Sequence, residues 1–282
     1  MHIAYFPKQT ALDSEPIWQA FLESCKARNI TPVENSYDAD AAVIWSVLWN
    51  GRMKENQKVW NHYRNQNKPV FVLEVGALDR GRLWKVAING INRSANFGPA
   101  GMDSKRRAQI RLVANPWRQS SDIVLCIQHA LSQQWENMPT TAQWVEDTII
   151  HLRRYTDRKI IIRSHPRWVY QSKQVFNNVE IDHPRPNNES INFKNSLNSA
   201  WAIVSWNSNP GVVAAIEGVP VFVGPDSLAR PVGNLNFETI ENPTMPDRTQ
   251  WLNDLAYTEW TVDEIMSGKP LERLLSSLTF GQ

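Results

Sequence analysis

Residues 200–224, AWAIVSWNSNPGVVAAIEGVPVFVG, contain two strand-like apolar runs on either side of a short helical stretch. The first run, Ala200–Ser205, has the length of a buried strand and ends in small polar residues. Pro210 suits the first turn of a helix, and the small residues after it allow that helix to approach a sheet closely. The second run is Val219–Val223. This strand–helix–strand order is the unit from which open parallel sheets are built.

The same alternation of apolar runs and amphipathic stretches covers the rest of the chain. Residues 80–97 predict a hairpin or an irregular insertion, with a turn at Asn89-Gly90. Further strands are predicted at His2–Phe6, Ala41–Ser46, Pro69–Val75, Ile123–Ile127, Lys159–Arg163 and Val179–Ile181. Helices are predicted at Glu15–Arg28, Glu55–Asn65, Thr140–Arg154, Ser190–Leu197, Pro210–Glu217, Arg248–Ala256, Val262–Ser267 and Leu271–Leu278.

A length of 282 residues is about twice that of a typical domain, so we expect two domains. The predicted fold is α/β, with two Rossmann-like domains facing a cleft. Residues 1–135 form the N-terminal domain, 136–246 the C-terminal domain, and 247–282 a helical tail packing back toward the N-terminal domain. Two distant cysteines exclude a disulfide framework, and no apolar run or basic leader suggests a membrane span or signal. We therefore expect a soluble, cytoplasmic monomer that needs no membrane.

The polar residues after the strand 200–205 predict an anion site. Ser205, Asn207 and Ser208 fall at a helix N-terminus, where free N–H groups and the helix dipole attract a diphosphate. Glu217 falls at the end of the same helix, from which a carboxylate could accept hydrogen bonds from ribose hydroxyls. An ordinary capped crossover would have the same pattern, so this alternative stays open.

A second constellation is IIIRSHPRW, residues 160–168. Alternation along a continuing strand would place Arg163, His165 and Arg167 on one side of its carboxyl end. Two guanidinium groups and an imidazole could clamp a diphosphate and neutralise the charge on a departing nucleotide. The alternative for His165 is an ordinary loop histidine with its own partners.

The stretch 200–224 resembles the donor-nucleotide half of GT-B glycosyltransferases, particularly the capsule-polysaccharide and Kdo-transferase-like group. The matching pattern is a strand, S-x-N-S-x-x-G, a helix and E-G-x-P-V-x-V, over about 25 residues. The resemblance implies a nucleotide-sugar donor, such as a UDP-sugar, and cations in place of a metal. The donor-binding residues are then Arg163, His165, Arg167, Ser205, Asn207, Ser208, Gly211 and Glu217, with Gly218 and Pro220 completing the motif.

Residues 76–92 and 257–268 are similar to phage-type proteins associated with virus-encoded DNA glycosyltransferases. This weaker resemblance implies double-stranded DNA with hydroxymethylated pyrimidines, such as hydroxymethylcytosine, as acceptor, in the cytoplasm of an infected bacterium. Residues 80–118 hold nine cations and one acid, a net charge of +8 that suits a polyanion. The expected DNA contacts are Arg80, Arg82, Lys85, Arg93, Lys105, Arg106, Arg107 and Arg111. A solvated loop with paired charges is the alternative.

An inverting transfer needs a carboxylate to take the proton of the acceptor hydroxyl. Asp79, in the loop after the strand Pro69–Val75, is the first choice as this base, and Glu74, at the end of that strand, is the second. With Arg163 and His165 they make up the predicted catalytic set. No metal cofactor is expected, because Asp38-Ala39-Asp40 precedes a strand instead of ending one and the histidines lack ligand spacing.

The sequence thus favours a metal-independent, inverting glycosyltransferase acting on phage DNA. Two alternatives remain: a GT-B enzyme with a polysaccharide acceptor, and a DNA-binding protein without catalytic activity on the same fold. The motifs of nucleotide hydrolases, dinucleotide enzymes and α/β-hydrolases do not occur in the sequence.

Overall fold

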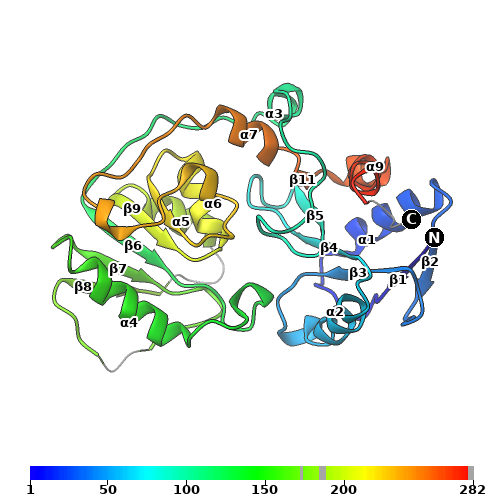
Figure 1. The fold of residues 1–282 in the computed structure, drawn as a ribbon, viewed down its shortest axis with the longest axis horizontal. Coiled ribbons are helices and arrows are strands. Elements are labelled where there is room, and N and C mark those ends of the chain that lie inside the picture. The colour runs from blue at the N-terminus through cyan, green and yellow to red at the C-terminus, as the bar shows by residue number, and fades with distance from the viewer. Residues whose placement is uncertain (172–173, 184–188, 279–282) are drawn as a thin grey trace. The chain divides into compact units, whose positions relative to one another are not determined.

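The computed structural model describes residues 1–171, 174–183 and 189–278, which fold into two compact units (Figure 1). The first unit combines Met1–Leu112 with Leu252–Gln282, and the second is Val113–Trp251. Each unit is an α/β sheet covered by helices. Within the described ranges, no helix is both long enough and apolar enough to cross a bilayer.

The first unit is built on a sheet with the strand order β11-β5-β4-β3-β1-β2. Strands β1 to β4 run parallel to their neighbours, whereas β5 and β11 are antiparallel. The bounds are β1 His2–Tyr5, β2 Thr31–Glu34, β3 Ala41–Trp45, β4 Val70–Val75, β5 Trp84–Ile88 and β11 Glu259–Trp260. The order reverses between β1 and β3, so the switch point of this sheet lies at their carboxyl ends.

Helices bury apolar side chains on both faces of this sheet. On one face, α1 (Glu15–Lys26), α8 (Val262–Met266) and α9 (Lys269–Ser276) contribute Phe21, Ile265 and Leu271 to a core that includes Phe71. On the other face, α2 (Asn56–Asn65) packs against β3 and β4. The predicted return of the C-terminal helices to the N-terminal domain is therefore confirmed.

The second unit contains a sheet of five parallel strands in the described residues, in the order β10-β9-β6-β7-β8. The bounds are β6 Asp122–Cys126, β7 Ile160–Arg163, β8 Val179–Asp182, β9 Ala200–Ser205 and β10 Val221–Val223. In chain order this is 5-4-1-2-3, the Rossmann arrangement, with its switch point between β6 and β9. Helix α4 (Thr141–Leu152) fills the core on one face, and α6 (Asn209–Ile216) packs on β9 and β10.

The structure divides the chain at a different place from the sequence prediction. The domain predicted over 1–135 included the strand at 123–127, but β6 is the central strand of the second sheet. Residues 113–121, before β6, form no helix or strand. The tail predicted at 247–282 also divides, because Leu252 and the residues after it belong to the first unit.

Among the α-helices and strands of the described residues, three short ones have no counterpart in the prediction: β2, β11 and α3 (Lys105–Gln109). The turn at Asn89-Gly90 is present, with both residues at positive φ. The expected hairpin is reduced to an isolated bridge between Ile88 and Asn96, since β5 pairs with β4 and β11 instead.

Candidate functional site

The switch point of the second sheet gathers polar residues from the ends of β6, β7 and β9. The chain continues from β6 to Gln128 and His129, from β7 to Ser164 and His165, and from β9 to Trp206 and Asn207. Because all five strands are parallel, these residues share the carboxyl edge of the sheet. Ligands of open α/β sheets bind at this edge, beside the switch point.

Three side-chain atoms between the end of β9 and the start of α6 have no hydrogen-bond partner among the described residues. Ser205 and Asn207 are 2% and 7% exposed, yet Ser205 Oγ, Asn207 Oδ1 and Ser208 Oγ make no hydrogen bond. Ser208 has the extended backbone of an N-cap residue, but its hydroxyl accepts no bond from the helix. Leaving a buried polar atom unpaired costs about 1–3 kcal/mol, which a ligand with complementary groups would recover.

Because Gly211 has no side chain, the first turn of α6 can pack close to the Ser205 hydroxyl. A Cβ at this position would lie 2.9 Å from Ser205 Oγ and 3.0 Å from Val223 Cγ1. The structure therefore places four of the predicted donor-binding residues together: Ser205, Asn207, Ser208 and Gly211. Asn209, the first residue of α6, offers its N–H at the same helix end.

Gln128, which the sequence interpretation did not single out, ties the two central strand ends together. Its Oε1 accepts a hydrogen bond from the backbone N–H of Asn207 at 3.2 Å. Its Nε2 donates to Gln134 Oε1 at 2.9 Å, in the short helix η2 (Gln133–Trp135). Both polar ends of the buried amide are thus fixed, and the loops after β6 and β9 are held side by side.

A cluster of aromatic rings follows Gln128 at the same strand ends. The ring of His129 packs 5.3 Å from that of His165 and 5.2 Å from that of Trp168. The Nδ1 atoms of the two histidines accept from backbone N–H groups, of Leu131 and Arg167 respectively, so the neutral forms carry their proton on Nε2. Burial, and secondarily the charge of Arg167, lowers the pKa of His129.

Arg163 does not join the predicted diphosphate clamp. It is 6% exposed, and its Nη1 lies 2.5 Å from Asp182 Oδ2 on β8 and 3.1 Å from Ser196 Oγ on α5 (Glu189–Ser196). Strand β7 ends at Arg163 and the chain then turns, with a bridge between His165 and Trp168, so alternation does not extend to residue 167. Arg163 is an ion-paired residue of the sheet, and Arg167 is exposed.

Glu217 is also separated from the site. Helix α6 spans eight residues, about 12 Å, and leads back to the amino edge, where β10 begins. There the Glu217 carboxylate accepts from Asn115 Nδ2 at 2.8 Å and pairs with Lys194 Nζ at 3.1 Å. The predicted ribose contact is therefore wrong for this geometry, because the length of the helix separates Glu217 from Ser205 and Asn207.

The two candidate bases lie in the first unit. Glu74, partly buried on β4, accepts from Ser46 Oγ at 2.5 Å and from the backbone N–H of Val75 at 2.8 Å. Asp79 forms an ion pair with Arg82, 2.5 Å between Oδ2 and Nε, with both side chains about half exposed. Neither arrangement tests the role of the residue, so the choice of base stays a prediction.

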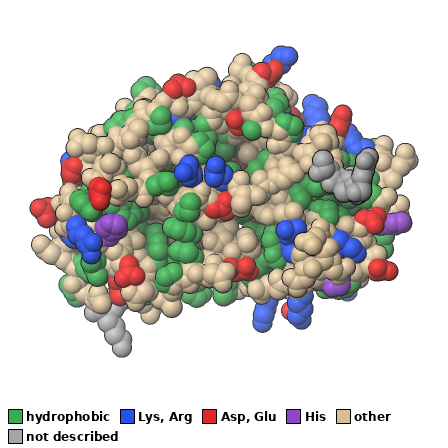
Figure 2. Space-filling model, viewed as in Figure 1, with side chains coloured by type: hydrophobic (Ala, Val, Ile, Leu, Met, Phe, Trp, Pro, Cys, Tyr) green, Lys and Arg blue, Asp and Glu red, His purple; other side chains and the backbone are tan. Residues whose placement is uncertain are grey.

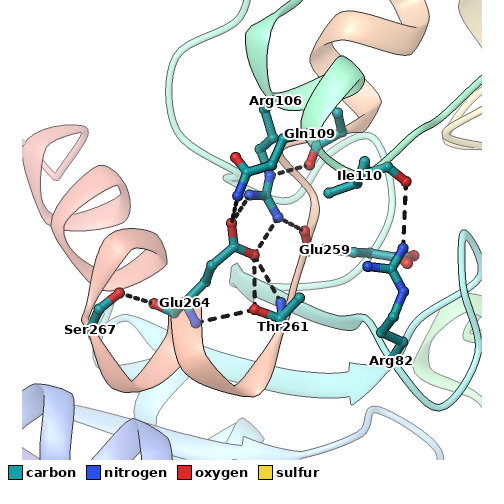
Figure 3. A network of polar contacts seen from close by, with 9 residues as sticks. Arg82, Arg106, Gln109, Ile110, Glu259, Thr261, Glu264 and Ser267 are labelled. Atoms are coloured by element: carbon teal, nitrogen blue, oxygen red, sulfur yellow. Dashed lines mark hydrogen bonds and ion pairs between the residues drawn. The ribbon is translucent and has the colours of Figure 1, made fainter.

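Two cations of the basic stretch are buried and cannot contact DNA in this fold. Lys85 is 1% exposed on β5. Arg106, 4% exposed, forms a bidentate pair with Glu264 and donates to the carbonyls of Ala256 and Glu259, both at 2.6 Å (Figure 3). Its guanidinium also lies 3.9 Å from the Trp260 ring centre. For these two residues the predicted DNA contact is wrong.

The other predicted DNA contacts lie nearer the surface. Arg82 pairs with Asp79, Lys105 pairs with Asp103 at 3.5 Å, and Arg107 Nε donates to the Leu112 carbonyl at 3.1 Å. Arg80, Arg93 and Arg111 are exposed, as is Arg82 in its pair with Asp79. On the face drawn in Figure 2, basic and acidic side chains are interspersed. The +8 stretch is thus partly neutralised within the fold.

Comparison with solved structures identifies the fold. No family model and no curated protein matches the sequence. Among solved structures, the chain is similar to the β-Kdo 2,4 transferase of Thermosulfurimonas dismutans KpsC, with a TM-score of 0.58, 13% identity, and coverage of 96% of this chain and 98% of that chain. For the β-Kdo 2,7 transferase of the same protein, the TM-score is 0.59 at 14% identity, covering 96% and 100%. The predicted α/β fold of GT-B type is confirmed, whereas the resemblance to phage DNA glycosyltransferases stays a prediction.

Proposed function

We propose that the protein is a glycosyltransferase that binds a nucleotide-sugar donor at the carboxyl ends of β6 and β9. The observation that carries this proposal is the group of unpartnered atoms on Ser205, Asn207 and Ser208, at the start of α6 and beside a Rossmann switch point. A phosphate accepts hydrogen bonds from hydroxyl and N–H donors, and ribose or sugar hydroxyls can donate to Asn207 Oδ1. The similarity to two Kdo transferases supports the same reaction class.

The residues present can carry the charge of the leaving nucleotide without a metal. Arg167 supplies a cation, and His165 can donate from Nε2. The N-terminal N–H groups of α6 add the positive end of the helix dipole. We therefore propose a metal-independent transfer, for which undiminished activity in EDTA is the expected result. Activity that disappears and returns only with a divalent ion would refute it.

Nucleotide binding tests the donor site directly. Isothermal titration with UDP, CMP and GDP should show that the protein binds at least one of them. Ser205→Ala and Ser208→Ala should each weaken that binding by about tenfold to a hundredfold, the worth of one hydrogen bond to an anion. Glu217→Gln, at the opposite end of α6, is the matched control and should bind as wild type. Equal effects at both ends of the helix, or no binding of any nucleotide, would contradict the proposal.

For the acceptor we propose a saccharide. The two similar structures are transferases of Kdo, a sugar, and two cations of the basic stretch, Lys85 and Arg106, are buried. In an inverting transfer, Asp79 or Glu74 would take the proton of the acceptor hydroxyl. Incubation of the protein with a nucleotide-sugar panel and an oligosaccharide panel, followed by mass spectrometry, tests this acceptor class.

Duplex DNA with hydroxymethylated pyrimidines is the second candidate acceptor. The observation in its favour is that Arg80, Arg93, Lys105 and Arg111 remain exposed. If DNA binds there, Arg93→Glu, Lys105→Glu and Arg111→Glu together should reduce the slope of log affinity against log salt by about 3. Arg106 stays unchanged in this variant, because its loss would unfold its surroundings. Absence of duplex binding at low salt, with transfer to an oligosaccharide, would exclude this candidate.

A further inference from the structure

Ser46 has a backbone conformation that is unusual for its residue type. Eight residues other than glycine have positive φ in the described ranges, and six of them are asparagine, which tolerates this region. The exceptions are Arg111, which is exposed, and Ser46, which has φ 63° and is 3% exposed. Such strain persists where the surrounding structure imposes it, and it is concentrated at binding and catalytic sites. Ser46 directly follows β3, at the switch point of the first sheet.

The strained backbone aims the Ser46 hydroxyl at Glu74. Its N–H continues the β3–β4 ladder by donating to the Leu73 carbonyl at 2.8 Å. Its Oγ accepts from the Leu48 N–H at 3.1 Å and donates to Glu74 Oε2 at 2.5 Å. The hydroxyl proton is therefore committed to the carboxylate. Each carboxylate oxygen of Glu74 has one partner, Ser46 or the Val75 N–H, and retains capacity for another donor.

Glu74 begins a row of charged residues across three strands. Lys85 on β5 stands opposite Glu74, and Glu259 on β11 stands opposite Lys85. Burial lowers the pKa of Lys85 and raises that of Glu259, while the attraction between their charges opposes both shifts. Glu259 is further held by the N–H groups of Ala77 and Leu78. The buried Lys85 thus stands between two carboxyl groups, those of Glu74 and Glu259. Of the three residues only Glu74 is partly exposed, so its carboxylate is the hydrogen-bond acceptor that a ligand can reach.

Asn56 adds a second acceptor next to Ser46. It is fully buried, and its Nδ2 donates to the carbonyls of Gln9 at 2.9 Å and Trp45 at 2.6 Å. These two bonds fix the orientation of the amide, so the atom left without a partner is Oδ1, an acceptor. The carboxyl ends of β3 and β4 therefore present oxygen atoms that need donors. A phosphate, which offers only oxygens, is repelled by this set, whereas a sugar hydroxyl satisfies it.

We propose that the ends of β3 and β4 form a binding subsite for a hydroxyl-rich ligand, a saccharide, whose hydroxyl donates to Glu74 while Ser46 holds that carboxylate in place. That this ligand is the acceptor of the transfer rests on the proposed function. Asp79 is less suited to the role, because its carboxylate is engaged by Arg82. Ser46 is a positioning residue in this subsite, and Asn56 marks an adjoining place for a hydroxyl donor.

Saturation-transfer NMR on the full chain, with a panel of neutral methyl glycosides in the millimolar range, tests the subsite. Glu74→Gln keeps the shape and removes the charge, and it should lower glycoside affinity about tenfold or more. Ser46→Gly suits positive φ, so it should keep or raise the urea midpoint while lowering glycoside affinity several-fold. A merely structural serine would leave binding unchanged in this variant. Glu34→Gln, at the carboxyl end of the parallel strand β2, is the matched control and should bind as wild type.

Titration of the same variants with UDP, CMP and GDP separates this inference from the proposed function. Loss of glycoside binding with intact nucleotide binding supports the subsite. Nucleotide binding without any glycoside binding in wild type overturns the subsite and leaves the donor site standing. Glycoside binding without nucleotide binding supports the subsite and overturns the proposed donor site. Unchanged glycoside affinity in both Glu74→Gln and Ser46→Gly also overturns the inference.

Discussion

Arg106→Ala should destabilise the first unit strongly, because Arg106 joins α3 to the C-terminal segment through a buried network (Figure 3). The side chains of Arg106 and Glu264 are 4% and 7% exposed. Glu264 also caps α8, since its carboxylate accepts from the N–H of Thr261 at 3.0 Å. Removing the guanidinium therefore leaves a carboxylate buried at the start of a helix without its cation.

The magnitude follows from the contacts that are lost. Breaking a buried ion pair by deleting one partner costs about 3–5 kcal/mol, because the remaining charge stays desolvated. The carbonyls of Ala256 and Glu259 lose their donor, and Trp260 loses the guanidinium on its ring. These losses belong to one network and do not add in full, so we expect about 4 kcal/mol. A typical domain has a free energy of unfolding of about 5–15 kcal/mol, so the variant should be only marginally folded.

Hydrogen exchange of the amides between residues 256 and 267, together with urea unfolding, measures this loss. Arg106→Lys keeps the positive charge but loses the bidentate hydrogen bonds of the guanidinium. Its free energy of unfolding should therefore lie between those of wild type and Arg106→Ala. Arg93→Ala, an exposed arginine of the same basic stretch, is the matched control and should change the free energy of unfolding by less than about 0.5 kcal/mol. A cost below about 1 kcal/mol for Arg106→Ala would show that the network is not desolvated as described.

The network also predicts a dependence on pH. Burial acts to raise the pKa of Glu264, but the bonds from Arg106 and Thr261 outweigh it, so the pKa in the folded protein is lowered. The resulting stabilisation is complete above the unfolded carboxyl pKa of about 4.3 and is lost as the pH falls through the lower folded value. The difference in stability between wild type and Arg106→Ala should therefore shrink below about pH 4. A difference that stays constant to lower pH would contradict this assignment.

Three further predictions concern the second unit and the thiols. Arg163→Met should cost about 1–3 kcal/mol in urea unfolding, since the Asp182 carboxylate loses its cation. Cys25 and Cys126 should not react with a thiol reagent in the folded protein, because burial raises the pKa of each to about 12; labelling without denaturant would refute this. His129→Asn should weaken the pH dependence of nucleotide binding: in wild type, affinity should rise as the pH falls and His129, whose pKa is lowered by burial, gains its proton. Identical pH profiles in titration calorimetry would show that His129 does not face the nucleotide.

The elements that could be predicted from the sequence are those whose signal is local. The run KIIIR predicts β7, and Pro16 with one apolar face predicts α1, because each signal lies within the element itself. Strand β11 has two residues and is stabilised by pairing with β5, far away in the sequence. No local pattern could have revealed it. The same holds for the domain boundary, since the assignment of β6 depends on the strands that it joins.

The basic stretch shows the limit of counting charges. Arg106 and Glu264 are 158 residues apart, and nothing near Arg106 in the sequence shows that its charge is neutralised. Lys85 is the only charged residue of β5, WKVAI, and a strand that is otherwise apolar throughout could have indicated burial of both faces. A count of cations reports the net charge of a segment, whereas the number available to a polyanion depends on pairing across the fold.

The donor site could be predicted in part, because only some of its residues are neighbours in sequence. Ser205, Asn207, Ser208 and Gly211 are neighbours in sequence, so one strand-to-helix turn brings them together. Glu217 belongs to the same motif, but the length of α6 takes it to the other edge. Gln128 and His129 come from β6, and the rule that polar residues after parallel strands share one edge would have found them.

The two sheets share an arrangement that explains where their free polar groups lie. In the second unit, one row of neighbouring positions contains Ser205, Cys126, Arg163 and Asp182. In the first unit, the corresponding row contains Ser46, Glu74, Lys85 and Glu259. In each row the buried cation has a carboxylate on an adjacent strand at the same height: Arg163 forms an ion pair with Asp182, and Lys85 stands between Glu74 and Glu259. The serine in each row lies next to the switch point, away from the cation. In the second unit the row therefore leaves the Ser205 hydroxyl at the switch point as the group that can meet a ligand. In the first unit it leaves the Glu74 carboxylate, which the Ser46 hydroxyl holds in place.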